Sequence, residues 1–299
     1  MRLPYVTLDV FTDRRFGGNQ LAVLPDARGL TTEQMQAITR EFNFSESTFV
    51  LPPTDPQNDA QVRIFMPGRE VPFAGHPNVG TAYALAMIGH VQGKPVGDIL
   101  RFEEQAGLVQ MAINRDGSGH PQSTELTAPA SLAVGQPKPV AHVCAATGLA
   151  PDAVLQAHHT AQTVSVGLPF TIVELASLDA LAAVKPDLAA FDRHFAGEEG
   201  DALYLYVRTG DACVQARMLA PLHGVVEDPA TGSAAAALTG YLAHIAAADA
   251  GTFPLTIAQG LEMGRPSIIQ GVAEKSKGIV HAVRVGGPSV AVMEGFLTV

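Results

Sequence analysis

The sequence has 299 residues, of which 47% are hydrophobic and 16% are charged, and its formal net charge is −10. This composition is typical of a globular protein with one large core or two ordinary domains, and it argues against a disordered chain. The chain lacks the clustered lysines and arginines that nucleic acids and anionic membrane surfaces attract, so we expect neither as a partner.

The cysteines and apolar stretches place further limits on the class of protein. Cys144 and Cys213 occur in unrelated contexts, so neither a disulfide framework nor a CxxC metal site is expected. The N-terminal residues read as a strand and not as a signal peptide, because Asp9 interrupts the apolar run. The longest apolar stretch, Ala234–Ala248, is too short and too often interrupted to span a bilayer. We therefore expect a soluble cytoplasmic protein.

The first half of the chain carries alternating strand and helix signals. A hydroxyl cap followed by acidic and amide residues predicts a helix from Thr31 to about Phe42. A second, apolar helix is expected after the segment Val71–Ala82 and continues to about Ile88. The predicted strands, rich in β-branched and aromatic residues, are Pro4–Phe11, Gln20–Leu24, Ser47–Leu51 and Gln61–Met66.

A segment rich in proline, alanine and glycine, Ala128–Pro139, predicts a linker. The second half then shows strand and helix signals up to a last strand, Ser289–Val299. Short strands outnumber helices and do not strictly alternate with them, which predicts an α+β fold. We expect domains at 1–127 and 128–299, with the last strand a candidate to pack back on the first domain.

One short pattern occurs in both halves. The segments HPNVGTA, from His76, and DPATGSA, from Asp228, share the pattern [HD]-P-x-x-G-[ST]-A, and 228 minus 76 gives an offset of 152 residues. A weaker similarity relates Gly18–Leu24 to Gly167–Val173. An internal duplication explains both, and it predicts two similar domains whose motifs face each other across a cleft.

Each motif is expected to begin a helix. A residue before proline avoids helical dihedral angles and proline favours the first helical position, which predicts His76 and Asp228 as N-caps. The unpaired N–H groups of such helix ends favour a carboxylate or a developing enolate. The motif glycines leave room for a ligand near that backbone, and the motif hydroxyls add donors. These residues are Gly80, Gly232, Thr81 and Ser233.

Each motif alone is more often a structural cap than a site, but the matched pair favours function. Glu46, between a predicted helix and a strand, reads from spacing alone as an exposed loop carboxylate. If its loop lies at the cleft, burial would raise its pKa into the range that general acid–base catalysis uses. Arg265 is either a surface residue or a cation that orients a carboxylate.

Several common site motifs are absent from the sequence. It contains no P-loop, GxGxxG, HExxH or G-x-S-x-G pattern, and the adjacent pair His158 and His159 is poorly spaced for one metal. We therefore expect neither a metal nor a cofactor.

Five segments make the chain resemble the phenazine-biosynthesis isomerase (PhzF-like) family over nearly its whole length. They are Asp9–Val23, Phe44–Val50, Pro72–Ala82, Asp228–Leu238 and Gln259–Ser267. The resemblance implies a diaminopimelate-epimerase-like fold, in which two similar domains each wrap a sheet around a central helix. It also implies an active site in the interdomain cleft and a homodimer.

The resemblance implies that Glu46 is the acid/base that shuttles a proton, and that His76, Asp228 and Ser233 line the substrate and assist. The expected catalytic residues are thus Glu46, His76 and Asp228. The expected substrate-binding residues are Gly75, Asn78, Gly80, Thr81, Gly232 and Ser233.

The resulting hypothesis is a cofactor-independent isomerase that moves a proton between carbons of a small carboxylate-bearing metabolite. Epimerases and racemases of this fold use two opposed cysteines, but the corresponding positions hold Gly75-His76 and Asp228-Pro229, which disfavours two-thiol racemisation. The alternatives are an epimerase or dehydratase of an amino or hydroxy acid, and a non-catalytic metabolite-binding protein.

Overall fold

The structure is a computed structural model that describes residues 1–299. The chain divides into two compact units. The first unit comprises Met1–Pro129 and Gly286–Val299, and the second comprises Ala130–Val285. The last strand thus belongs to the first unit, and the division follows Pro129, two residues after the expected boundary.

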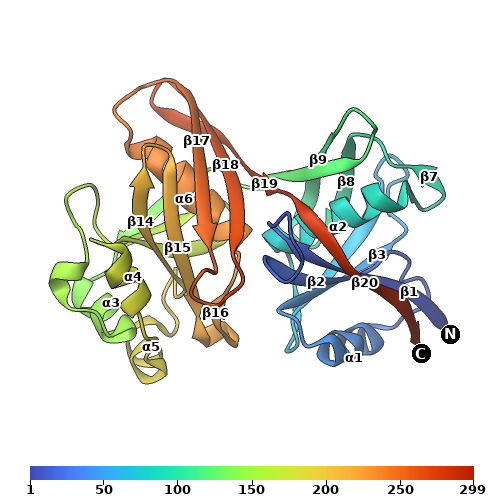
Figure 1. Cartoon of the computed structure of the whole chain (residues 1–299), viewed down its shortest axis with the longest axis horizontal. Coiled ribbons are helices and arrows are strands. Elements are labelled where there is room, and N and C mark those ends of the chain that lie inside the picture. The colour runs from blue at the N-terminus through green and yellow to red at the C-terminus, as the bar shows by residue number, and fades with distance from the viewer. The chain divides into compact units, whose positions relative to one another are not determined.

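The first unit contains two α-helices, α1 (Thr32–Phe42) and α2 (Gly75–Ile88). Its strands are β1 (Arg2–Val10), β2 (Asn19–Leu24), β3 (Glu46–Leu51), β4 (Ala60–Phe65), β5 (Glu70–Val71), β6 (His90–Val91), β7 (Lys94–Pro95), β8 (Ile99–Glu104), β9 (Gly107–Arg115), β10 (Pro121–Thr127) and β20 (Ser289–Thr298). The chain ends lie together in Figure 1 because β1 and β20 pair antiparallel, with Arg2 opposite Thr298.

The second unit contains the helices α3 (Val140–Thr147), α4 (Leu178–Ala183), α5 (Leu188–Phe195) and α6 (Gly232–Ile245), and the 3₁₀ turns Pro151–Ala153 and Pro221–His223. Its strands are β11 (Ala133–Pro137), β12 (Gln162–Ser165), β13 (Pro169–Glu174), β14 (Leu203–Gly210), β15 (Cys213–Ala220), β16 (Val225–Asp228), β17 (Gly251–Gln259), β18 (Ser267–Ser276) and β19 (Ile279–Gly287). The expected linker is therefore shorter than predicted, because Ala133–Pro137 pairs with β12 as a strand.

Each unit wraps its strands around one helix. Helix α2 contacts β1, β2, β3, β9, β10 and β20, and α6 contacts β12, β13, β17 and β18. Both helices are apolar on nearly all sides, as a helix at the centre of a core must be. Figure 1 shows each central helix against the strands of its own unit. This arrangement confirms the predicted α+β fold of the diaminopimelate-epimerase-like type.

The strand order is duplicated as well as the motif. In the first unit β2 and β3 are parallel, β3 and β4 antiparallel, β4 and β8 parallel, and β8 and β9 antiparallel. In the second unit the same sequence of pairings joins β13, β14, β15, β17 and β18. The weaker sequence similarity falls on β2 and β13, which are equivalent in this order.

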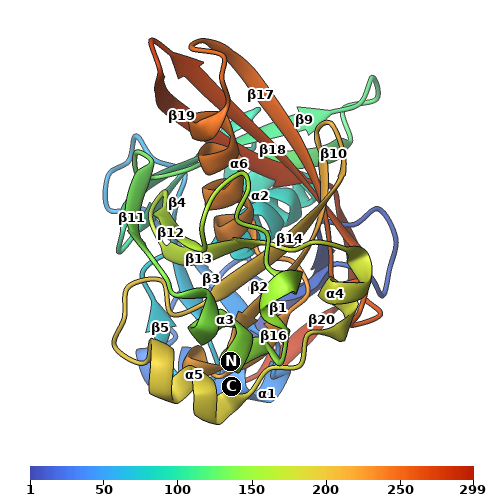
Figure 2. The same ribbon diagram turned by 90° about the vertical axis from the view of Figure 1, so that its left-hand side faces the viewer.

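Outer helices cover the other face of each sheet. Helix α1 begins with the predicted hydroxyl cap, in which Thr31 and Gln34 form a capping box, and it packs Met35 and Ile38 against Phe49 and neighbouring residues. In the second unit α3, α4 and α5 pack against the alternate residues of β14 that point away from α6, among them Leu203, Leu205 and Val207. Figure 2 shows α3 and α5 side by side, as their contacts require.

The predicted N-cap of α2 is wrong. The cap residue is Ala74, with φ −154° and ψ 144°, and the helix begins at Gly75, so that His76 is the second helical residue and Pro77 the third. Proline is tolerated throughout the first turn, because the N–H groups of that turn have no partner within the helix. The proline therefore did not fix where the helix starts.

The predicted N-cap of α6 is wrong for a different reason. Thr231 is the cap residue and Gly232 begins the helix, while Asp228 is the last residue of β16. The Gln259 side chain at the end of β17 accepts a hydrogen bond of 3.3 Å from the Thr231 N–H. A side chain from a distant strand therefore pairs with the N–H of the cap residue, which lies three residues after Asp228.

Candidate functional site

The parallel pairing of β2 and β3 brings two polar residues together. Asn19 begins β2, Glu46 begins β3, and Leu21 lies opposite Glu46. The Ser45 hydroxyl, one residue before Glu46, donates to Asn19 Oδ1 over 3.1 Å. The first residues of two adjacent strands thus place an amide and a carboxylate at the same end of the sheet.

The loop before Asn19 is built to place it. Buried Asp9 accepts a hydrogen bond of 2.6 Å from the Phe16 N–H, and Phe16 has a left-handed φ of 70°. Gly18 also has a positive φ of 62°, and a Cβ there would lie 2.3 Å from Val10 O, so only glycine fits. These constraints fix the backbone that leads into β2.

His76 completes the group. Its Nδ1 lies 3.2 Å from Asn19 Nδ2, and its Nε2 lies 3.6 Å from Glu46 Oε2. The His76 side chain is 5% exposed and that of Glu46 is 14% exposed, so the loop carboxylate is largely withdrawn from water. The structure thus brings together Glu46 and His76, which the sequence singled out, and adds Asn19 and Ser45.

Burial makes the His76 imidazole neutral. Removal from water lowers the pKa of His76 to about 3, and the backbone of Gln20 opposes that shift only in part. In the tautomer that accepts the hydrogen bond of the Asn19 amide at Nδ1, the imidazole proton lies on Nε2, the atom nearest Glu46. Nε2 is buried and has no hydrogen-bond partner. A carboxylate and an unused N–H donor therefore adjoin one space, which suits proton transfer next to a developing negative charge.

Gly80 and Thr81, in the motif that begins at His76, have roles in packing. A Cβ on Gly80 would lie 2.5 Å from Leu21 Cδ2 and 2.7 Å from Val10 Cγ2, so this glycine allows α2 to approach the sheet and does not make room for a ligand. The Thr81 hydroxyl is fully buried and bonds Thr48 Oγ1 over 2.8 Å. The expected ligand-facing roles of Gly80 and Thr81 are therefore corrected to helix packing.

In the second unit, Asp228 lies in a dense hydrogen-bond network. It is 6% exposed, and its Oδ2 accepts a hydrogen bond of 2.5 Å from the Thr231 hydroxyl. The Gln259 amide donates to Asp228 O over 2.8 Å and to Thr231 Oγ1 over 3.1 Å. Tyr204 donates to Gln259 Oε1 over 3.0 Å, and burial followed by the charge of Asp228 raises the pKa of Tyr204.

The segment after Gln259 folds back on the same motif. A Cβ on Gly260, whose φ is 75°, would lie 2.5 Å from Arg265 O and 2.6 Å from Pro229 O. The Ser267 hydroxyl donates to Pro229 O over 3.1 Å. Arg265 is half-buried, which differs from a plain surface arginine. Ser233 is the second residue of α6 and is half-buried, whereas Gly232, the first residue of the helix, is buried.

Sequence reasoning missed Asn19, Ser45, Thr231 and Gln259 as members of these groups. Asn19 follows two glycines, Gly17 and Gly18, a pattern that by itself indicates only a turn, and Gln259 lies far along the chain from the motif it holds. The residue patterns of β2 and β17 carry no local signal for these contacts, because strand pairing creates them.

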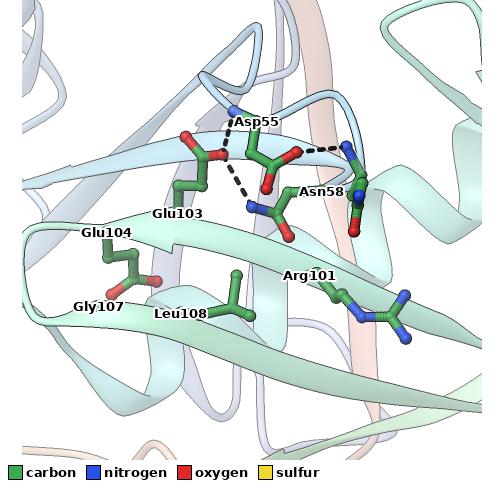
Figure 3. A pocket seen from close by; sticks show the side chains of 8 residues that line it. Asp55, Asn58, Arg101, Glu103, Glu104, Gly107 and Leu108 are labelled. Carbon is green, nitrogen blue, oxygen red and sulfur yellow. Dashed lines mark hydrogen bonds between the residues drawn. The ribbon is translucent and has the colours of Figure 1, made fainter.

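One pocket of about 690 Å³ lies in the first unit, away from Glu46 and His76. Its lining residues are Asp55, Gln57, Asn58, Arg101, Glu103, Glu104, Gly107 and Leu108. Figure 3 shows Glu103 bonded to the loop above it, where its carboxylate accepts from Thr54 N, Asp55 N and the Asn58 amide at 2.7–2.9 Å. These bonds, that of Asn58 first, lower the pKa of Glu103 to about 2.

No group of three or more His, Cys, Asp or Glu side chains is placed to hold a metal ion. No helix has both the length and the apolar character that a membrane crossing requires.

The architecture is that of the epimerase-like fold, with a carboxylate–imidazole pair in its first unit, and known proteins show which family the chain belongs to. The family model described as phenazine biosynthesis-like protein (PhzC-PhzF) matches residues 8–295. The chain belongs to this family.

Two relatives and one solved structure are similar along the whole chain. An uncharacterized isomerase of Mesorhizobium japonicum is 40% identical over 300 residues, 98% of each chain. The trans-2,3-dihydro-3-hydroxyanthranilate isomerase of Pseudomonas fluorescens is 37% identical over 294 residues, 97% of this chain and 98% of the relative. A PhzF-family structure from Bacillus anthracis superposes with a TM-score of 0.88 at 23% identity, covering 100% of both chains, and shows the shared fold. By these relationships the chain is a PhzF-like isomerase.

Proposed function

We propose that this isomerase moves a proton between two carbons of a small carboxylate-bearing metabolite, with Glu46 as the acid/base and without a cofactor. One observation carries the proposal: Glu46 Oε2 lies 3.6 Å from the Nε2 of a buried, neutral His76. Such a pair supplies a base for a C–H bond and a hydrogen-bond donor for the charge that follows.

The reaction balances without an external electron acceptor. The Glu46 carboxylate takes a proton from one carbon, and the electrons of that C–H bond move into the adjoining unsaturated system. The His76 Nε2–H donates a hydrogen bond to the negative charge that accumulates there. Glu46 then returns the same proton to a different carbon, so bonds are rearranged and the composition of the substrate is unchanged.

Asp228 and Ser233 receive assisting roles in this proposal, as do Gly75 and Gly232 on the substrate side, whereas the fully buried Asn78, expected to bind substrate, bonds Ala74 O. The support is the resemblance of both motifs to the family pattern, together with the rigid hydrogen-bonded setting of Asp228. Gly80 and Thr81 are not proposed to contact the substrate.

The first substrate to test is trans-2,3-dihydro-3-hydroxyanthranilate, because relatives at 37% identity are named as its isomerase. It is also a small carboxylate with a carbon-bound proton next to unsaturation. Compounds that raise the melting temperature of the protein in a panel of small carboxylic acids form the second group.

The experiment incubates the protein with each compound in deuterated water and follows the products by NMR and mass spectrometry. The proposal expects deuterium at the carbon that receives the proton and a product isomeric with the substrate. An inverted stereocentre would indicate an epimerase, and loss of water would indicate a dehydratase. Binding of compounds without any exchange into carbon would contradict the proposal and indicate a binding protein.

We also propose a homodimer located in the cytoplasm, as the family resemblance suggests. Light scattering coupled to size-exclusion chromatography tests the dimer: a mass of about twice the 31.3 kDa chain is expected, and the monomer mass would contradict it.

A further inference from the structure

Glu104, the last residue of β8, is a carboxyl group that the mechanism does not use. Both of its carboxyl oxygens are buried and have no hydrogen-bond partner. Figure 3 shows that Glu103 and Glu104 leave the strand in opposite directions, as consecutive strand residues do. Burial raises the pKa of Glu104 to about 8, and the Asn78 side-chain amide lowers it only in part. Glu104 is therefore mainly uncharged at pH 7.

Asn78, which lies next to Glu104, has an amide oxygen that lacks a hydrogen-bond donor. It belongs to the first turns of α2, two residues after His76, and its Nδ2 donates to Ala74 O over 3.0 Å. Its Oδ1 is buried and has no partner. An amide oxygen only accepts hydrogen bonds, so it needs a donor from a neighbouring group.

A proton on Glu104 supplies the donor that Asn78 Oδ1 lacks. An ionised Glu104 would only accept, leaving its own oxygens and Asn78 Oδ1 in a buried place without a hydrogen bond, which costs free energy. Exchanging the nitrogen and oxygen of the Asn78 amide would break the bond from Nδ2 to Ala74 O. A protonated Glu104 that donates to Asn78 Oδ1 leaves the Ala74 bond intact.

The duplicated second unit shows a neutral side chain in the equivalent place. Gln259 ends β17, which runs parallel to β15 just as β8 runs parallel to β4. Gln259 holds the start of α6 through Asp228 O and Thr231, and it is an uncharged amide with both donors and an acceptor in use. Glu104 stands at the corresponding strand end beside the start of α2.

We propose that Glu104 is a positioning residue: it carries a proton in the working protein and donates it to Asn78 Oδ1, which fixes the first turn of α2 and the His76 imidazole on it. The charged and titratable groups on the elements around it are Asp55 and Asp59 in the loop before β4, Arg63 on β4, Arg101 and Glu103 on β8, Arg115 on β9, and His76 and Tyr83 on α2. None of them contributes to the shift at Glu104, whose cause is burial. The link to catalysis rests on the proposed function of Glu46 and His76.

A ligand-free measurement tests the proton directly. In protein labelled with ¹³C at the glutamate carboxyl carbons, the resonance that Glu104→Gln removes should titrate near pH 8. The Asn78 side-chain NH₂ signals should shift with the same midpoint. A Glu104 resonance that titrates between pH 4 and 5 would overturn the proposal, whether or not the protein turns over any substrate.

Three variants test the link to His76 once a substrate is known. Glu104→Gln keeps a donor, so kcat should stay within about threefold of the wild type, whereas Glu104→Met, of similar size without a donor, should lose about tenfold or more in kcat. The wild-type rate should fall as pH rises through about 8, and Glu104→Gln should remove that limb. Glu103→Gln, on the opposite side of β8, is the matched control and should keep the wild-type pH profile.

Equal kcat values for the Gln and Met variants would overturn the positioning role. An inactive wild type would instead contradict the proposed function, and the carboxyl titration would still decide whether Glu104 holds its proton.

Discussion

The starts of α2 and α6 share one sequence pattern, but their buried polar groups are satisfied to different degrees. At α6, Gln259 bonds Asp228 O, the Thr231 N–H and the Thr231 hydroxyl. At α2, His76 Nε2, Asn78 Oδ1 and both oxygens of Glu104 have no hydrogen-bond partner. A buried polar group without a partner costs about 1–3 kcal/mol. The two copies thus share a backbone pattern, but only the start of α2 holds buried polar groups without hydrogen-bond partners, which a ligand or an added proton can satisfy.

The largest effect on stability is expected at the start of α6, where the buried polar groups have hydrogen-bond partners. Gln259→Met removes the amide that pairs with two buried backbone groups at the start of α6, so the free energy of unfolding should fall by about 3–5 kcal/mol. Urea unfolding monitored by circular dichroism measures this change. The exposed Gln270→Met should change it by less than about 0.5 kcal/mol. Equal stabilities for the two variants would mean that Gln259 does not hold the motif.

The start of α2, where His76 is buried without a partner at Nε2, should make the free energy of unfolding depend on pH. The pKa of His76 in the folded protein, about 3, lies below the ordinary histidine value of 6.5, so the stability that the neutral imidazole contributes is complete above pH 6.5 and is lost as pH falls toward 3. Between pH 7.5 and 4 the wild type should lose about 3 kcal/mol more unfolding free energy than His76→Asn. The exposed His281→Asn is the control and should follow the wild-type curve. Parallel curves for the wild type and His76→Asn would contradict the burial of a neutral imidazole.

Gly80 tests whether the motif glycine in the first copy serves packing. Gly80→Ala places a Cβ 2.5 Å from Leu21 Cδ2, and the net loss of stability should be about 1–2 kcal/mol after the better helix propensity of alanine is included. Gly68→Ala, where a Cβ meets nothing within 4 Å, should be nearly neutral. Thermal unfolding checks both variants. An unchanged melting temperature with a weaker substrate affinity would restore the ligand-facing interpretation of Gly80.

A smaller effect is expected at the residue that orients His76. Asn19→Ala removes the donor to His76 Nδ1 and the acceptor of the Ser45 hydroxyl, which frees the imidazole to take its other tautomer. The value of kcat should fall by about tenfold with little change in KM. Steady-state kinetics of Asn19→Ala beside the exposed Asn114→Ala make the comparison, and identical kcat values would remove Asn19 from the site.

The sequence predicted β1 to β4, β20 and the central helices closely, because their apolar patterns are strong and local, but it did not define the shorter strands between α2 and Thr127. It misplaced both helix starts, since His76 and Asp228 were assigned to caps that Ala74 and Thr231 occupy. A proline fits several positions of the first turn of a helix, so it does not fix the start of α2. At α6, the group that pairs with the N–H of the cap residue Thr231 is the side chain of Gln259, far along the chain.

The site was predictable only where a local sequence pattern marks its residues. The motif repeat pointed to His76, but Glu46 came from the family resemblance, because a loop carboxylate has no periodic signal. The contacts of Asn19 with His76 and of Glu104 with Asn78 join a strand to helix α2 across 57 and 26 residues of sequence, respectively. No local pattern encodes such contacts.

The most direct test of the central claim compares solvent-deuterium incorporation by the wild type and Glu46→Gln at one substrate concentration. Because a single general acid/base contributes roughly a hundred- to ten-thousand-fold, the account predicts a loss of that size in the initial rate. The unfolding midpoint should remain unchanged, since the glutamine keeps the size of the side chain. A Glu46→Gln variant that incorporates deuterium at the wild-type rate would contradict the account.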